Sequence, residues 1–265
     1  MEPIRVVING ALGRMGQQIT EAVVREPGLR AVGVVEKEVT QQYLALPETL
    51  ELIPFSSDLD SLLKGCDADV VVDFTNAEVS MAAARTAIGR GVNMVIGTTG
   101  LSEENLTEIA KLCQAGKAGA VVAPDFSLGA ALLIHLSRFA ARFFDRAEII
   151  EMHHDKKADA PSGTAIATAR AMSQARGKPF IHPEANNEVL SHTRGGQIDG
   201  IAIHSLRLPG FLAGQEVVLS GAGETLSLRH SAIGRECYLP GVMLAIKEVT
   251  RRKGLTYGLD ALLDL

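Results

Sequence analysis

Residues 4–36 follow the order strand, glycine turn, helix and strand, which restricts the possible fold more than any other feature of the chain. An apolar run of strand length at 4–9 is followed by a G-x-x-G-x-x-G turn at 10–16, and a helical stretch covers 17–25. Glycines spaced in this way let the backbone approach a pyrophosphate at the N-terminus of the next helix. The segment predicts the start of a parallel α/β sheet whose first loop binds a dinucleotide. The alternative is a glycine turn that serves only the tight packing of strand on helix.

An acidic residue closes the second strand of this segment. The apolar run 29–35 ends in Glu36, which lies 20 residues after Gly16, where the ribose of a dinucleotide needs a hydrogen-bond acceptor. Lys37 follows it. At an effective dielectric of about 20, one charge at about 4 Å contributes roughly 4 kcal/mol, so the two side chains would repel and attract a 2′-phosphate by comparable amounts. We therefore predict that the chain accepts both NADH and NADPH.

Apolar strands alternate with capped helices as far as residue 127. Asp58 and Ser102 are the predicted N-caps, and Gly91 and Gly116 are the predicted C-caps. Continuous apolar strands of this kind indicate a parallel sheet with helices on both faces, in which ligands bind beyond the carboxyl ends of the strands. The expected strands are 68–74, 93–97 and 120–123, and the expected helices are 58–64, 77–90 and 102–115.

The pattern changes after residue 128. An amphipathic helix is expected at 128–144, with Leu132, His135, Leu136, Phe139 and Phe143 on one face. We interpret His135 as a hydrogen-bonded core residue rather than a ligand. Long, half-polar strands then predict a mostly antiparallel or mixed sheet with helices on one side and a face open to another subunit. The expected strands are 147–152, 197–208, 216–220 and 225–230, and the expected helices are 165–176, closed by Gly177, and 241–252.

Composition narrows the class of protein. A chain of 265 residues with 46% hydrophobic residues can form one large or two moderate domains with a substantial core. No apolar run reaches the roughly 18 residues of a membrane span and no leader is recognisable, so we expect an unprocessed protein without a membrane partner. The three cysteines lie far apart in the sequence, so we expect reduced thiols and no disulfide framework, which is typical of a cytoplasmic protein. The net charge of −5 argues against a nucleic-acid partner.

The stretch 151–165 gathers two imidazoles and two ammonium groups in front of a predicted helix. Histidine titrates near neutral pH and suits a general acid, while the N–H groups of Gly163 and Thr164 at a helix start can receive a carboxylate or phosphate. A metal site would need three or four convergent ligands, and Lys156 and Lys157 oppose a cation, so no metal is expected. The stretch also fits a solvated, charged loop.

These residues resemble a known family. Residues 151–165 are similar to the signature E-x-H-H-x-x-K-x-D-A-P-S-G-T-A of the dihydrodipicolinate reductases, also called 4-hydroxy-tetrahydrodipicolinate reductases, and 10–16 to their G-A-x-G-R-M-G loop. Residues 97–100 resemble the second cofactor loop of the family, and 194–196 with 200–208 resemble its second-domain sheet. The resemblance covers essentially the whole chain. It implies an NAD(P)H-dependent oxidoreductase that converts 4-hydroxy-tetrahydrodipicolinate, a small dicarboxylate, to tetrahydrodipicolinate with loss of water, in the diaminopimelate route to lysine.

The resemblance also implies an organisation and residue roles. A Rossmann-like dinucleotide-binding domain would comprise 1–127 and 235–265, and an α+β domain at 128–234 would bind substrate and build a homotetramer through its mixed sheet. His153 would be the proton donor or acceptor and Lys157 the proton donor. The implied substrate contacts are His154, Ser162, Gly163 and Thr164. The implied dinucleotide contacts are Gly10, Ala11, Leu12, Gly13, Arg14, Met15, Glu36, Lys37, Gly97, Thr98, Thr99, Ala123, Pro124, Asp125 and Phe126.

Two positions and two alternatives stay open. Asp125 stands where the family usually has Asn, so an amide donor becomes an acceptor, and Arg235 is a further candidate substrate contact. Another two-domain NAD(P)-dependent dehydrogenase, acting on an amino acid or a semialdehyde, would share the cofactor half but give no reason for the His-His-Lys run. A non-catalytic dinucleotide sensor would need the glycine loop and no proton donor.

Overall fold

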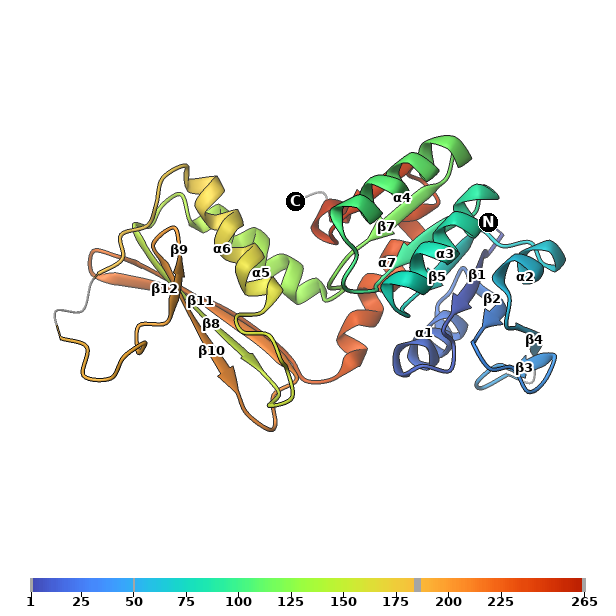
Figure 1. The fold of residues 1–265 in the computed structure, drawn as a ribbon, viewed down its shortest axis with the longest axis horizontal. Coiled ribbons are helices and arrows are strands. Elements are labelled where there is room, and N and C mark those ends of the chain that lie inside the picture. The colour runs from blue at the N-terminus through green and yellow to red at the C-terminus, as the bar shows by residue number, and fades with distance from the viewer. Residues whose placement is uncertain (1, 50, 184–186, 264–265) are drawn as a thin grey trace. The chain divides into compact units, whose positions relative to one another are not determined.

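The computed structural model describes residues 2–49, 51–183 and 187–263, which form two compact units (Figure 1). The first unit comprises Met1–Leu128 and Tyr238–Leu265, and the second comprises Gly129–Cys237. The domain boundaries expected from the sequence lie between residues 127 and 128 and between residues 234 and 235.

Among the described residues, the first unit contains an eight-stranded sheet in the order β13-β7-β6-β5-β1-β2-β4-β3. All neighbouring strands are parallel except β3 and β4. The three outer strands β3, β4 and β13 were not predicted, because runs this short show no clear period. The strands are β1 (Ile4–Asn9), β2 (Leu29–Val35), β3 (Tyr43–Ala45), β4 (Leu52–Ser56), β5 (Val70–Asp73), β6 (Asn93–Ile96), β7 (Gly119–Val122) and β13 (Gly254–Tyr257).

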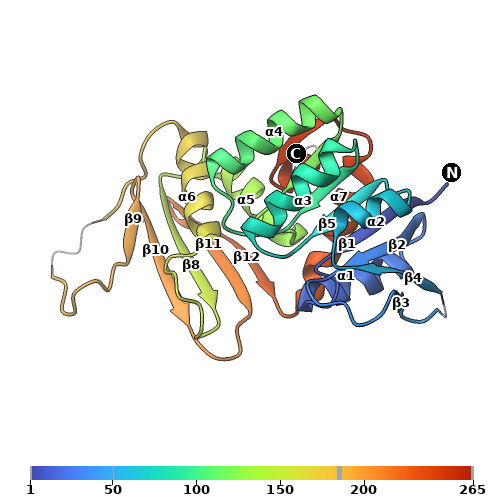
Figure 2. The same ribbon diagram turned by 45° about the vertical axis from the view of Figure 1, so that its right-hand side comes forward.

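Helices cover both faces of this sheet, as the apolar strands predict. The central strands β5 and β7 are buried along their whole length, which a parallel sheet between two helix layers requires. Helices α2, α3 and α4 pack in succession, and α1 packs against α7 (Figures 1 and 2). The helices are α1 (Arg14–Arg25), α2 (Leu59–Gly65), α3 (Ala77–Gly89), α4 (Glu103–Gly116) and α7 (Leu239–Val249).

The helix caps agree with the sequence at the N-termini and differ at one C-terminus. Asp58 and Ser102 accept hydrogen bonds from the first turns of α2 and α4, as predicted. The prediction that Gly116 caps α4 is wrong, because the left-handed cap is Lys117 with φ 53°. Gly116 instead packs against Ile88, whose carbonyl oxygen would lie 2.1 Å from a Cβ at this position. This glycine therefore serves close helix packing and not the turn.

The second unit contains a mixed sheet, as predicted. It has five strands in the order β12-β11-β8-β10-β9. Within the described chain, β8 and β10 pair in parallel and the other neighbours are antiparallel. Its core joins the sheet to helices α5 and α6. The elements are α5 (Leu128–Ala140), β8 (Arg146–His153), α6 (Gly163–Arg176), β9 (Gly196–Ile198), β10 (Ile201–Arg207), β11 (Ala213–Gly221) and β12 (Glu224–Ala232).

The single strand predicted at 197–208 is wrong. Asp199 and Gly200 have φ of 48° and 83° and separate β9 from β10, which pair as an antiparallel hairpin. Two consecutive positive φ values match the tight turn that Asp-Gly favours, and this signal was missed. A Cβ on Gly200 would lie 2.0 Å from the carbonyl oxygen of Phe180, so the turn needs glycine on packing grounds as well.

Helix α5 turns a different face to the core than the sequence predicts. The bulky face that contains Leu132, Leu136 and Phe139 is exposed, with 41–52% of each residue accessible, and His135 is half-buried. The buried positions are Ala130, Ala131, Leu133, Ser137 and Ala140. The helix has two apolar faces, and the face with the smaller side chains packs on the sheet. Small side chains let the helix lie close to the sheet, as a densely packed core requires.

Candidate active site

The glycine turn is shaped by contacts that leave no room for side chains. Gly10 has φ 78°, and a Cβ there would lie 2.6 Å from Cγ2 of Thr75. A Cβ on Gly16 would lie 2.0 Å from the carbonyl oxygen of Gly10. Gly13 is the N-cap of α1 and provides no side-chain hydrogen bond to the first turn. The N–H groups at the helix start therefore have no side-chain cap and fit an anionic pyrophosphate.

Glu36 lies at the end of β2 and faces this turn. Its carboxylate accepts hydrogen bonds from the backbone N–H of Leu12 at 3.0 Å and of Lys37 at 2.9 Å. The same residues line a hollow together with Glu38 and Thr40. The latter two were not predicted, since no motif marks them. The hollow offers the carboxylate and hydroxyl groups that sugar hydroxyls bind.

A buried carboxylate that the sequence analysis missed links the ends of three central strands. Asp73, at the end of β5, is fully buried and accepts hydrogen bonds from Asn9 Nδ2 at 2.5 Å, Thr75 Oγ1 at 2.9 Å and Thr98 Oγ1 at 3.0 Å. Ser80 also donates to it. The sequence predicts Thr98 as a dinucleotide contact, but its hydroxyl already donates to Asp73 inside the protein. A dinucleotide would therefore contact the backbone of Thr98 and not its side chain.

The loops after β5, β6 and β7 meet around a pair of aromatic rings. A Cβ on Gly97 would lie 2.0 Å from the ring of Phe74, which packs on Phe126 with centroids 5.3 Å apart. Phe126 is 2% exposed, so its ring belongs to the core. One oxygen of Asp125 accepts the N–H of Ser127 at 2.8 Å and stabilises the loop. The other expected dinucleotide contacts differ in exposure. Ala11 and Ala123 are buried and Met15 is half-buried. The exposed ones are Leu12, Gly13, Arg14, Lys37, Thr99 and Pro124.

In the second unit, β8 carries Glu151 and His153 on the same face, because side chains two residues apart along a strand point the same way. The Nδ1 atom of His153 lies 2.6 Å from Oε2 of Glu151. Arg207, the register partner of His153 on β10, donates to both carboxylate oxygens of Glu151, at 2.9 and 2.7 Å. The sequence analysis assigned no role to Glu151 or Arg207, because their meeting depends on the parallel pairing of β8 and β10.

The surroundings shift the pKa values of this pair. Burial lowers the pKa of His153, and the hydrogen bond and negative charge of Glu151 oppose this only in part, so the pKa lies below its usual value of about 6.5. Burial raises the pKa of Glu151, but hydrogen bonds from Arg207, Ser205 and His153 outweigh it and hold the carboxyl ionised. A neutral imidazole beside an ionised carboxylate is therefore the ordinary state at pH 7.

The loop that leaves β8 brings Lys157 into the same network. The backbone N–H of Lys157 donates to the carbonyl of His154 at 3.2 Å, which closes a turn. Its ammonium group lies 2.8 Å from the carboxylate of Asp159. The carbonyl of Asp159 accepts from Arg207 at 2.6 Å. Lys157 and His153 are thus connected through Asp159, Arg207 and Glu151.

Helix α6 begins beside this network. Ser162 is its N-cap: Oγ accepts from the N–H of Ala165 at 3.2 Å, and its own N–H donates to Glu151 at 3.3 Å. The N–H groups of Gly163 and Thr164 have no acceptor within the helix. Gly163 is exposed, with no atom within 4 Å of a Cβ built on it. The helix start can therefore receive a carboxylate. Arg235 lies in a short 3₁₀ helix and is half-buried.

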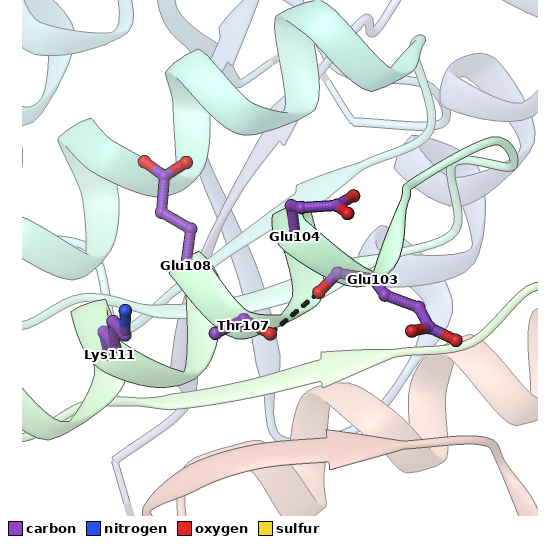
Figure 3. A pocket seen from close by; sticks show the side chains of 5 residues that line it. All are labelled: Glu103, Glu104, Thr107, Glu108 and Lys111. Carbon is purple, nitrogen blue, oxygen red and sulfur yellow. Dashed lines mark hydrogen bonds between the residues drawn. The ribbon is translucent and has the colours of Figure 1, made fainter.

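A separate hollow lies on α4 and has the wrong charge for an anionic ligand. Its lining contains three glutamates and one lysine, and Thr107 donates to the carbonyl of Glu103 at 2.9 Å (Figure 3). Across the described part of the chain, no group of three or more His, Cys, Asp and Glu is placed to hold a metal ion. No helix in the same ranges is long and apolar enough to cross a membrane.

Comparison with known proteins identifies relatives of the whole chain. Residues 4–126 match the family model described as dihydrodipicolinate reductase, N-terminus, and 129–263 match its C-terminal counterpart. The chain is 49% identical over 265 residues to a 4-hydroxy-tetrahydrodipicolinate reductase of Dehalococcoides mccartyi, covering 100% of both chains. It is 45% identical to that of Moorella thermoacetica, covering 98% of each.

Solved structures give the same result at the level of the fold. A dipicolinate-bound dihydrodipicolinate reductase from Paenisporosarcina sp. TG-14 superposes with a TM-score of 0.87 at 36% identity and covers 97% of this chain and 98% of its own. An amine dehydrogenase from Mycobacterium smegmatis superposes with a TM-score of 0.62 at 16% identity, covering 97% and 95%. The second likeness concerns the fold alone.

Proposed function

The chain belongs to the dihydrodipicolinate reductase family, and from this premise we propose how its own residues reduce 4-hydroxy-tetrahydrodipicolinate with NADH or NADPH. The reaction belongs to the diaminopimelate route to lysine. One hydride and one proton enter the substrate and one water leaves. The observation that carries the residue assignment is the network of His153, Glu151 and Arg207 beside the start of α6.

The first unit holds the dinucleotide in this proposal. When bound, the dinucleotide supplies the hydride. The turn 10–16 and the start of α1 bind the pyrophosphate, and Glu36 accepts hydrogen bonds from ribose hydroxyls. Support comes from the glycine contacts and from the start of α1, where Gly13 provides no side-chain cap. The loops 97–99 and 123–126 contribute mainly backbone groups, because Thr98 and Phe126 are buried.

The second unit binds the dicarboxylate in this proposal. The N–H groups of Gly163 and Thr164, with the hydroxyl-bearing N-cap Ser162, receive one carboxylate, and His154 and Lys157 provide further hydrogen bonds and positive charge. Lys157 must leave Asp159 to do so. The Paenisporosarcina reductase is described as dipicolinate-bound, and dipicolinate is a planar ring with two carboxylates. This supports a diacid site of the same chemistry here.

Proton delivery follows from the charge that hydride addition leaves on the substrate. In the free protein His153 is neutral at pH 7, because its pKa is lowered. A dianion bound beside the ring favours the charged imidazole and raises this pKa. Substrate binding therefore favours protonation of His153, which then donates this proton to the substrate. Lys157 acts as a second proton donor. Oriented donors at the start of α6 stabilise the developing negative charge.

A coupled assay tests the activity directly. The product that the preceding synthase forms from pyruvate and aspartate semialdehyde is supplied, and the loss of NADH or NADPH absorbance is followed. We expect oxidation of both dinucleotides, at a rate proportional to the amount of the protein. Reactions without the synthase or without the protein are the controls. Absence of oxidation with both dinucleotides would contradict the proposal.

Assembly and location complete the proposal. We propose a homotetramer in the cytoplasm, joined through the mixed sheet. Most of β12 is exposed in the single chain, and Ile233, directly after it, is 94% exposed. Light scattering should give four times the 28.1 kDa of one chain. A mass of 28.1 kDa at micromolar concentration would contradict the tetramer and leave the chemistry untouched.

A further inference from the structure

We propose that Glu151 is a positioning residue that holds the His153 ring with Nδ1–H toward the protein and leaves Nε2 to exchange the catalytic proton. The inference rests on the proposed role of His153. It gives a role of its own to Glu151, which the proposed function uses only as part of the network around His153. Three separate contacts of this one carboxylate support it.

The first contact fixes the ring. Oε2 of Glu151 lies 2.6 Å from Nδ1 of His153, and the Glu151 side chain is fully buried. The two residues share one face of a regular strand, so the backbone sets their spacing. A strong hydrogen bond at this distance restricts rotation of the imidazole about its bond to the strand.

The second contact keeps the carboxylate ionised. Arg207 donates to both oxygens of Glu151, at 2.9 and 2.7 Å, and Arg remains charged at all relevant pH values. An ionised carboxylate can only accept hydrogen bonds, so Nδ1 must carry the hydrogen in the neutral ring. The lone pair of the neutral ring is then on Nε2, and Nε2 is the atom that gains and loses the proton.

The third contact relates His153 to the substrate. Oε1 of Glu151 accepts the N–H of Ser162, the N-cap of α6, at 3.3 Å. The same carboxylate therefore holds the proton donor and the start of the helix that is proposed to bind the diacid. Its loss would disturb both the ring orientation and the spacing between ring and substrate. The charged groups that face His153 are Glu151, Lys157 and Arg207.

The chain offers a matched control on the same strand. Glu148 lies three residues before Glu151 and also contacts a histidine and an arginine: Oε2 lies 2.9 Å from Nε2 of His204, and Arg194 donates to Oε1. Its side chain points to the opposite face of β8, since the strand alternates. Glu148→Gln removes the same charge from the same kind of cluster, away from the proposed catalytic residues.

The experiment compares Glu151→Gln, Glu148→Gln and His153→Gln in the full chain. Gln presents an N–H where Glu151 presents a lone pair, so we expect kcat to fall about 100-fold, within the 10²–10⁴ range of a general acid. The basic limb of the kcat/KM profile should move to lower pH, because the negative charge that raises the pKa of His153 is gone. Glu148→Gln should leave both quantities unchanged.

The outcomes separate this inference from the proposed function. If His153→Gln is impaired while Glu151→Gln keeps normal kcat and the normal pH profile, the positioning role is overturned and the function stands. If His153→Gln has normal kcat, the proposed role of His153 as proton donor is wrong, and the inference about Glu151 falls with it.

A second measurement does not depend on whether Glu151→Gln folds. In the unchanged protein labelled with ¹⁵N-histidine, NMR above the titration range of His153 should show the tautomer with hydrogen on Nδ1. Finding the hydrogen on Nε2 would overturn the inference. Glu151→Asp, which keeps the charge, should retain the Nδ1–H tautomer.

Discussion

The ammonium group of Lys157 lies 2.8 Å from the carboxylate of Asp159, two residues further along the same loop. The hydrogen bond from Lys157 lowers the pKa of Asp159, so this carboxyl is ionised at pH 7. The lysine proposed to contact the substrate is therefore already paired with an internal anion. A substrate carboxylate has to compete with Asp159 for it.

Asp159→Asn should therefore strengthen dicarboxylate binding. Asp159 is mostly exposed, and exposed ion pairs contribute about 0–1 kcal/mol, so the inhibition constant of dipicolinate should fall by up to about fivefold. Asp155→Asn removes an exposed charge from the same loop and is the control. Weaker inhibition in Asp159→Asn would show instead that Asp159 orients Lys157 for the ligand.

The pH profiles of kcat and kcat/KM should have different basic limbs. The limb of kcat/KM reports the free protein, where burial lowers the pKa of His153 below about 6.5, and the acid form is lost as the pH rises through that value. The limb of kcat reports the complex with the dianion, which raises the pKa. The kcat limb should therefore lie at higher pH. Coinciding limbs would contradict proton loading by substrate.

Asp73→Ala should destabilise the first unit. It removes the acceptor of Asn9, Thr75 and Thr98 and leaves buried donors unsatisfied, at a cost of about 3 kcal/mol or more. Urea denaturation measures the change. Asp67→Ala, at a side chain that is 90% exposed, should change stability by less than about 0.5 kcal/mol. If Asp73→Ala lowered the free energy of unfolding no more than Asp67→Ala, the hydrogen bonds to Asp73 would not stabilise the first unit.

Gly16→Ala should abolish dinucleotide binding. The added Cβ would lie 2.0 Å from the carbonyl oxygen of Gly10, so the turn or α1 must shift. Titration of NADH fluorescence measures the affinity. Gly89→Ala is the control, because this position at the end of α3 has no atom within 4 Å of the new Cβ, and alanine favours the helix by about 0.5–1 kcal/mol. Normal NADH affinity in Gly16→Ala would exclude the turn from the dinucleotide site.

Lys37→Ala should shift the chain toward NADH. Lys37 is exposed, so solvent weakens its attraction to a 2′-phosphate, and we expect kcat/KM for NADPH to fall about tenfold, or roughly 1.4 kcal/mol, with little change for NADH. Glu38→Gln, in the same hollow, should act in the opposite direction. An equal loss for both dinucleotides would place Lys37 outside the reach of the 2′ position.

Local patterns predicted the elements whose energetics are local. The bounds 4–9 and 29–35 for β1 and β2 agree with the structure, because long apolar runs buried on both faces are visible in the chain itself. The caps Asp58 and Ser102 follow from hydrogen bonds within a few residues. The hairpin at Asp199 and Gly200 carried an equally local signal that was overlooked.

Long-range pairing decided what local patterns do not contain. Strand β13 exists because Gly254–Tyr257 pairs with β7, and the face of α5 that is buried is the one that packs on the sheet of the second unit. In the Asp73 network, the hydrogen bond from Asn9 to Asp73 joins residues 64 positions apart in the chain. Such contacts depend on the register of neighbouring strands, which short sequence windows do not reveal.

The sequence by itself determined the class of fold, the dinucleotide loop at 10–16 and the residue types needed for proton transfer at 151–165, because glycine spacing and side-chain chemistry are properties of adjacent residues. Only the tertiary structure decided that Glu151 contacts His153, Arg207 and Ser162 at once. The parallel register of β8 and β10 brings Arg207 to His153 from 54 residues away. The physical reason is that a hydrogen bond depends on distance in space, and the sheet sets that distance.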